Sequence, residues 1–336
     1  MNKKLLGVAA AGTLLLGGCA SNEEGGATEE ANDQLTVYAS TFALKSFAEE
    51  IGGDRVRVEM VIPPGADPHT YEPTSKQMTD IAEADLFLTV GHDLEPYVES
   101  MEKSLANENV TFVKTAEDIT LLSADDTVHV HGEDEHSEED EHGHEDDDHA
   151  EEEAGHSEDD GHNHGQYDPH VWLDPMNAVS MAEAVEAAFS EQAPDYKDEF
   201  ADRLSAFKEE ATTLDGELQA AVDGGSKSEL LVTHAAYGYL AERYGFDQLP
   251  ITGLTPSEEP SQQALKRVIE EAQLHDLTHI AFEDTVTPKV AQVVQNEIGA
   301  ETVTIYNLES VTKEQMDKSY FDLMRENVKA LETALK

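Results

Sequence analysis

Residues 195–222, with the sequence DYKDEFADRLSAFKEEATTLDGELQAAV, separate the chain into two parts of similar construction. Their apolar side chains recur at three- and four-residue intervals, at Phe200, Leu204, Phe207, Ala211, Leu214 and Leu218. This spacing predicts one amphipathic helix. At 1.5 Å per residue it would be about 40 Å long, enough to run along two domains. Because Pro194 ends the preceding helical pattern, we place this linking helix at 194–222, and we expect a single helical connection to limit hinge motion.

On both sides of this helix, short apolar and β-branched runs alternate with helical patterns. We expect strands at 35–40, 56–62, 86–90 and 110–113, and again at 230–233, 249–253, 279–282 and 303–306. The helical patterns cover 45–51, 75–83, 177–193, 262–273 and 289–298. Alternation of strand and helix predicts mainly parallel sheets with helices on both faces. The predicted fold class is therefore α/β, with an N-terminal lobe over 34–193 and a C-terminal lobe over 223–336.

The first 33 residues have the pattern of a targeting segment. Lys3 and Lys4 precede a short apolar run at 5–16, which is followed by Leu-Gly-Gly-Cys at 16–19. We expect a lipoprotein signal peptide at 1–18, lipid on Cys19 and a flexible tether at 19–33. Cys19 is the only cysteine of the chain, so no internal disulfide can form. The mature protein is then expected to be anchored outside the cytoplasmic membrane, and the anchor and the acidity favour a Gram-positive cell surface.

The net charge of -51, from 72 acidic and 21 basic side chains, excludes some partners. Nucleic acid is not expected to bind, because binding it requires a basic face. Acidity of this size favours cations and solubility.

Between the two groups of strands lies an acidic, histidine-rich segment. From residue 125 to 164 there is no lysine or arginine, and apolar residues are rare. Such a composition cannot bury enough apolar surface to offset chain entropy, so we expect a disordered loop over 123–166. Histidine-rich tracts commonly bind metal, and imidazole suits zinc, copper and nickel. We interpret the loop as an auxiliary segment that gathers or senses zinc weakly, through His129, His131, His136, His142, His144, His149, His156, His162 and His164.

Three histidines and two glutamates lie where α/β sheets usually bind their ligands. His69 and His170 each stand in a proline-containing loop that enters a helix, and His234 ends a buried strand. Glu283 and Glu309 each follow a strand, and their positions do not decide which of them is the acidic ligand. Ligands of open α/β sheets bind outside the carboxyl ends of the strands. A site between two facing lobes could therefore collect these side chains.

Four segments carry a resemblance to a known family. They are Asp-Pro-His-Thr-Tyr-Glu-Pro at 67–73, His-Val-Trp-Leu-Asp-Pro at 170–175, Thr-His-Ala-Ala-Tyr-Gly-Tyr at 233–239 and Leu-Glu-Ser at 308–310. Together, and in this order, they resemble the zinc-binding lipoproteins of bacterial ABC importers, from about residue 35 to the end of the chain. The resemblance implies two α/β lobes joined by a rigid helix, with metal in the cleft between them.

The same resemblance implies a ligand set and a role. It makes His69, His170, His234 and Glu309 the ligands of Zn²⁺, with Glu283 as an alternative or supporting carboxylate. It also implies delivery of zinc to a membrane permease and no catalytic step, and we expect a monomer. Manganese- and iron-binding relatives usually have a carboxylate where this chain has His234, which favours zinc here.

The chemistry of the residues agrees with zinc. Three neutral imidazoles and one carboxylate can complete a tetrahedral shell, whereas manganese prefers more oxygen and a higher coordination number. Ligand histidines must be deprotonated, so capture is expected to weaken as the pH falls through about 6.5. A manganese or iron importer lipoprotein remains one alternative. A secreted zinc hydrolase with Glu283 as base is another, although the chain has no His-Glu-x-x-His motif.

Overall fold

The computed structural model describes residues 34–92, 94–128, 166–257, 260–285 and 289–336. Residues 34–336 form one compact unit. The predicted signal peptide, the tether and Cys19 lie outside the described residues, as do the nine histidines of the acidic loop.

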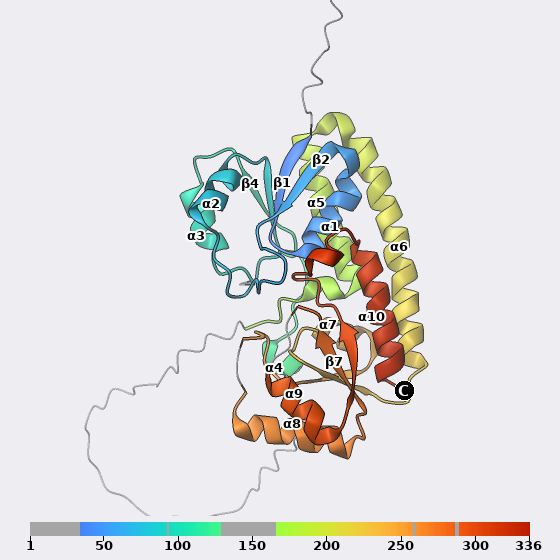
Figure 1. The fold of residues 1–336 in the computed structure, drawn as a ribbon. Coiled ribbons are helices and arrows are strands. Elements are labelled where there is room, and N and C mark those ends of the chain that lie inside the picture. The colour runs from blue at the N-terminus through green and yellow to red at the C-terminus, as the bar shows by residue number, and fades with distance from the viewer. Residues whose placement is uncertain (1–33, 93, 129–165, 258–259, 286–288) are drawn as a thin grey trace, which may run out of the picture. The chain divides into compact units, whose positions relative to one another are not determined.

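The first sheet contains four parallel strands in the order β2-β1-β3-β4. These are β1 (Leu35–Ala39), β2 (Val56–Met60), β3 (Leu86–Thr89) and β4 (Thr111–Lys114). Helices α1 (Phe42–Gly52) and α5 (Pro175–Gln192) pack on one face, and α2 (Ser75–Ala82) and α3 (Val98–Ser104) contribute to a separate apolar cluster (Figure 1). All four strands agree with the predicted ones to within a few residues at each end.

The second sheet repeats this arrangement in the order β6-β5-β7-β8, again with parallel strands. Its strands are β5 (Glu229–Val232), β6 (Asp247–Pro250), β7 (His279–Glu283) and β8 (Glu301–Ile305). Helices α8 (Gln262–Leu274) and α9 (Lys289–Ile298) enclose one apolar cluster, while α7 (Gly238–Tyr244) and α10 (Tyr320–Ala334) belong to the main core. The prediction of two parallel α/β lobes is therefore confirmed.

One long helix, α6 (Lys197–Asp223), runs past both lobes (Figure 1). It begins three residues after Pro194, because residues Pro194–Tyr196 form the short 3-10 helix η3. The six apolar residues that predicted it are all buried, and α6 packs on α1, α5, α7 and α10. A single apolar cluster therefore includes residues of both lobes and of the helix between them.

The remaining short elements were not predicted from the sequence, and neither were α3, α7 and α10. They are η1 (Gly53–Arg55), α4 (Ala124–Val128), η2 (Val171–Leu173) and η4 (Lys313–Gln315). Helix α4 occupies the first residues of the expected acidic loop and contacts β6, where Gln248 Nε2 donates to the Thr127 carbonyl at 2.7 Å. Within the described residues, no helix is both long and apolar enough to span a membrane.

Candidate metal centre

His69 lies in the loop between β2 and α2. Asp67, two residues before it, accepts a hydrogen bond from the His69 backbone N–H at 2.9 Å. Beyond it, Thr74 and Gln77 form a capping box at the start of α2. The loop is thus fixed on both sides of the histidine, whose side chain is 9% exposed.

His170, like His69, has an aspartate two residues earlier that accepts a hydrogen bond from its backbone N–H. Asp168 Oδ1 accepts from the His170 backbone N–H at 2.9 Å and contacts the ring Nδ1 at 2.7 Å. The Trp172 ring packs edge-on against the imidazole, with ring centroids 5.6 Å apart. A carboxylate on Nδ1 sets the tautomer that leaves Nε2 free to bind a metal. His170 is completely buried, and its Nε2 faces the cleft between the lobes.

His234 follows β5 and has a supporting carboxylate of its own. Its Nδ1 is hydrogen-bonded to Glu283 Oε1, and Glu283 is the last residue of the neighbouring strand β7. Its Nε2 is buried without a hydrogen-bond partner among the described residues. A buried ring nitrogen left unpaired is unfavourable, unless a ligand satisfies it.

Glu309 lies in a loop of the C-terminal lobe that the N-terminal lobe fixes in place. The Asn307, Leu308 and Glu309 carbonyls accept from Trp172 Nε1 at 2.7 Å, Ala43 N at 3.0 Å and Phe42 N at 2.9 Å, respectively. Between the two polar residues, Leu308 has a positive φ of 58° and a fully buried side chain. A left-handed non-glycine residue costs about 1–3 kcal/mol and persists only where its surroundings enforce it. Here the enforced turn places the Asn307 and Glu309 side chains within contact of one another.

The four side chains meet at a single point. One ligand atom from each of His69, His170, His234 and Glu309 lies within 4.8 Å of every other. Glu309 Oε1 lies 3.1 Å, 2.7 Å and 3.8 Å from the Nε2 atoms of these histidines, in that order. In a tetrahedral zinc site with bonds of about 2.0–2.1 Å, neighbouring ligand atoms lie about 3.3 Å apart. The donor set and its spacing therefore fit a four-coordinate metal with small side-chain adjustments.

The electrostatics of the metal-free cluster favour protons on the histidines. Burial lowers the pKa of His170, but the Asp168 charge and hydrogen bonds to Asp168 and Glu309 outweigh it and raise the pKa to about 9. Burial likewise lowers the pKa of His234, and the opposing effects of Glu283 and Glu309 raise it to about 10. Although burial raises the pKa of Glu309, the three histidines hold it well below its usual value. A metal ion entering the cluster must therefore displace protons.

Glu283, the rival acidic candidate, lies on the outer side of His234 and outside the four-residue cluster. Its Oε1 contacts His234 Nδ1, and its Oε2 accepts from Asn307 Nδ2 at 3.0 Å. Both oxygens are thus engaged, and the carboxylate is buried. Glu283 thus contacts the His234 ring on its Nδ1 side, away from the Nε2 atom that belongs to the cluster.

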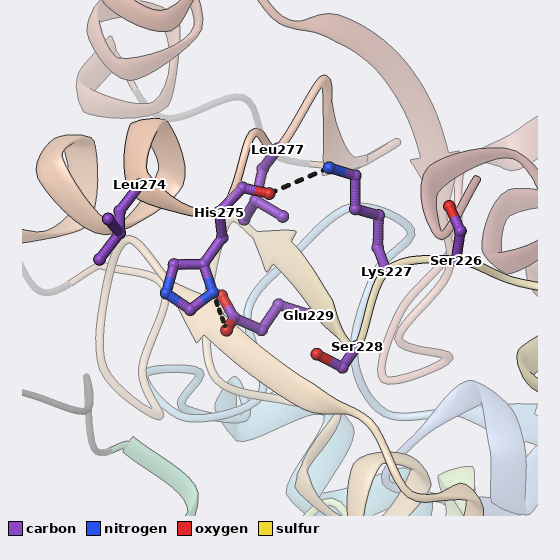
Figure 2. A pocket seen from close by; sticks show the side chains of 7 residues that line it. All are labelled: Ser226, Lys227, Ser228, Glu229, Leu274, His275 and Leu277. Atoms are coloured by element: carbon purple, nitrogen blue, oxygen red, sulfur yellow. Dashed lines mark hydrogen bonds and ion pairs between the residues drawn. The ribbon is translucent and has the colours of Figure 1, made fainter.

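Other described histidines do not join a metal cluster. His275 lines a separate hollow of about 320 Å³ at the start of β5. Figure 2 shows its ring turned toward Glu229. Its second ring nitrogen faces a different carboxylate, that of Glu271, at 3.5 Å. His92 bonds the Ala116 carbonyl at 2.9 Å. Within the part of the chain that the structure describes, the four-residue cluster is the one group with metal-ligand geometry.

Three supporting residues were not singled out in the sequence, although signals for them exist. Asp168 and Asp67 stand in a repeated Asp-Pro-His tripeptide, in which each aspartate accepts from the histidine two residues later. Asn307 precedes Glu309 by two residues, and its Oδ1 accepts from the Glu309 N–H at 3.0 Å. Asparagine and aspartate often bond the backbone two residues on, so both spacings could have indicated these turns.

Comparisons with known proteins agree with this geometry. The family model described as "ZnuA: Zinc-uptake complex component A periplasmic" matches residues 37–334. The high-affinity zinc uptake system protein ZnuA of Bacillus subtilis is 34% identical over 330 residues, which cover 98% of this chain and 96% of that protein. The zinc-binding lipoprotein AdcA of Streptococcus pneumoniae is 30% identical over 308 residues, covering 90% of this chain but 56% of AdcA. This chain thus spans just over half the length of that relative.

A solved structure shows the same fold. The Zn(II)-bound ZnuA-like domain of Streptococcus pneumoniae AdcA matches with a TM-score of 0.69 and 27% sequence identity. The match covers 90% of this chain and 99% of that domain.

Proposed function

We propose that this chain, which belongs to the family of zinc-uptake complex component A, captures Zn²⁺ outside the cytoplasm as the solute-binding protein of an uptake system. The observation that carries the proposal is the convergence of three imidazole nitrogens and one carboxylate oxygen on one buried point. The unpartnered Nε2 of His234 at that point supports an ion as the missing partner. Zinc is cargo here, held by His69, His170, His234 and Glu309.

The donor set favours zinc over manganese. Imidazole suits zinc, while manganese prefers oxygen donors and higher coordination. Carboxylates that orient ligand histidines are frequent around protein-bound zinc, and Asp168 and Glu283 have this position. The similar proteins of Bacillus subtilis and Streptococcus pneumoniae are both named for zinc.

A hydrolase is the less supported candidate. It would need a general base within reach of a metal-bound water. Glu283 is occupied by His234 and Asn307, and three histidines with Glu309 already supply four ligands. A shell of four protein ligands is typical of closed, non-catalytic zinc sites. Catalytic zinc keeps one coordination position open for water.

The finer parts of the proposal concern location and partners. We infer that Cys19 carries a lipid that holds the monomeric protein at the outer face of the cytoplasmic membrane, at a Gram-positive cell surface. The loaded protein then delivers zinc to the permease of an ABC-type importer. The match to an uptake-complex component and the lipobox-like Leu-Gly-Gly-Cys sequence support these inferences.

For the acidic segment we propose an auxiliary role. Its nine histidines among carboxylates would gather zinc weakly, because imidazole and carboxylate both bind zinc. The tight site would not require them, since its four ligands come from elsewhere in the chain.

Isothermal titration with zinc tests the site assignment. Metal-free wild-type protein is compared with His69→Ala, His170→Ala and His234→Ala, and His275→Ala serves as a control outside the cluster. We expect the first three variants to lose most of the affinity and His275→Ala to keep it. Tight binding that survives all three substitutions would contradict the assignment.

A further inference from the structure

Asn307 connects Glu309, the proposed acidic ligand, with Glu283, the carboxylate that contacts His234 Nδ1. Its side chain is 5% exposed, and its Nδ2 donates to Glu283 Oε2 at 3.0 Å and to Glu309 Oε2 at 3.2 Å. Its Oδ1 accepts from the Glu309 backbone N–H at 3.0 Å. One amide thus uses both of its ends on the residues that surround the metal site.

The two oxygens of Glu309 are consequently not equivalent. Oε1 faces the three histidine Nε2 atoms at 2.7–3.8 Å, whereas Oε2 is turned to the Asn307 amide. A carboxylate that donates both oxygens to a metal would have to turn about its last side-chain bond, and that turn would break the bond from Asn307. Glu309 is therefore presented as a ligand with one oxygen.

The same amide also supports His234. Glu283 bonds His234 through Oε1 and Asn307 through Oε2, so Asn307, Glu283 and His234 form a continuous chain. On the side of the proposed metal, Glu309 Oε1 lies 3.8 Å from His234 Nε2. The position of one imidazole and the orientation of the acidic ligand therefore depend on one side chain.

We propose that Asn307 is a specificity-determining positioning residue, which keeps Glu309 a one-oxygen ligand and thereby favours four-coordinate zinc over manganese. This inference rests on the proposed zinc-binding function. Three imidazoles and one carboxylate oxygen give four donors, the number that zinc prefers in closed protein sites. A second Glu309 oxygen would raise the number to five and increase the oxygen share, which suits manganese better.

A purely structural role for Asn307 predicts a different result. If Asn307 served only to shape the turn around Leu308, its loss would lower the affinity for all metals by the same factor. Asn327 offers a matched control, because it is fully buried and braces the same segment from outside the site. Its Oδ1 accepts from Tyr306 N, and its Nδ2 donates to Tyr306 O, each at 2.8 Å, without reaching either carboxylate.

The test compares Asn307→Ala, Asn307→Asp and Asn327→Ala with the wild type. Asn307→Asp keeps the size and the acceptor oxygen, so it provides a folded variant should Asn307→Ala not yield one. Zinc and manganese affinities are measured by competition with a chelator, and the visible spectrum of the Co²⁺-loaded protein reports its coordination number.

We expect both Asn307 variants to lower the zinc-to-manganese affinity ratio at least tenfold, and to weaken the visible bands typical of tetrahedral Co²⁺. Asn327→Ala should leave the ratio and the spectrum unchanged. An unchanged ratio and spectrum in the Asn307 variants would overturn the proposal. Failure of the wild type to bind zinc tightly would instead contradict the proposed function, so the two failures are distinguishable.

Discussion

Two of the three histidines of this site have a carboxylate bonded to the ring nitrogen that faces away from the cluster. His170 and His234 each place Nδ1 against a buried carboxylate, from Asp168 and Glu283 respectively, and Nε2 toward Glu309. This arrangement orients the ring for a metal, but in the absence of metal it also stabilises the protonated ring. The pKa of free histidine predicts that zinc binding weakens as the pH falls through about 6.5. The contacts with Asp168 and Glu283 move this expected pH range upward.

We therefore predict that zinc capture releases about two protons at pH 7, since the pKa values of His170 and His234 are raised to about 9 and about 10. The metal-free form holds more protons than the loaded form, so the zinc affinity must rise with pH throughout pH 6–8. Titration calorimetry in buffers of different ionisation enthalpy measures the protons released. A zinc affinity that stays level between pH 7 and 8 would contradict this prediction.

A second prediction separates the ligand from its support. Glu283→Gln should weaken zinc binding by about 10–100-fold, the usual cost of losing an outer partner of a ligand histidine. Glu309→Gln should weaken it further, because it removes the charged oxygen that faces the metal position. Both substitutions keep the side-chain size, so zinc affinities from chelator competition can be compared directly. The reverse order would make Glu283 the ligand.

The sequence predicted the three histidines but could not decide between these glutamates. In the sequence both come at the end of a strand pattern, and the direction of the Glu309 side chain depends on the turn at Leu308, which has a positive φ. Leucine rarely adopts that conformation, so nothing in the sequence signals it. The hydrogen bonds that enforce the turn come from Phe42, Ala43 and Trp172, far away in the chain.

At the scale of elements, α6 joins the two lobes through apolar packing. Phe207, near its middle, contacts the rings of Phe47, Tyr320 and Phe321 at centroid distances of 5.3, 6.5 and 4.8 Å. These partners belong to α1 and α10, one helix from each lobe. The helical spacing in the sequence predicted α6 and its buried face, but it could not identify the residues that this face contacts.

We predict that Phe207→Ala lowers the free energy of unfolding by about 3–5 kcal/mol, the usual cost of truncating a buried phenylalanine. Because this residue packs on both lobes, they should still unfold in one transition. Urea denaturation followed by circular dichroism measures both properties. Ser205→Ala, at an exposed position of α6, is the control and should change the stability little. An equally small change for Phe207→Ala would show that the helix is not a shared core element.

At the scale of the whole molecule, we assign tight zinc binding to the four-ligand site and weak zinc binding to the acidic segment. The four proposed ligands lie within one compact unit, and a backbone bridge between Ser123 and Tyr167 joins the chain on either side of the acidic segment. Composition predicted this segment as disordered from residue 123, whereas its first residues form α4. Their contact with β6 is long-range, and local composition does not report such contacts.

We predict that replacing residues 129–165 by a short glycine–serine linker removes weak zinc binding and keeps one tight site. Retaining residues 124–128 is essential to this design, because Gln248 bonds the Thr127 carbonyl. Zinc titration calorimetry should give a stoichiometry of one for the shortened protein and a higher value for the full chain. Loss of the tight site would refute this division of roles.

The most direct test of the account is a crystal structure of the zinc-loaded protein with anomalous data collected on both sides of the zinc edge. We predict one strong anomalous peak bonded to Nε2 of His69, His170 and His234 and to Oε1 of Glu309, with Glu283 remaining on His234 Nδ1. An ordered cleft without a zinc peak at this point, or a peak there with a different set of ligands, would contradict the central claim.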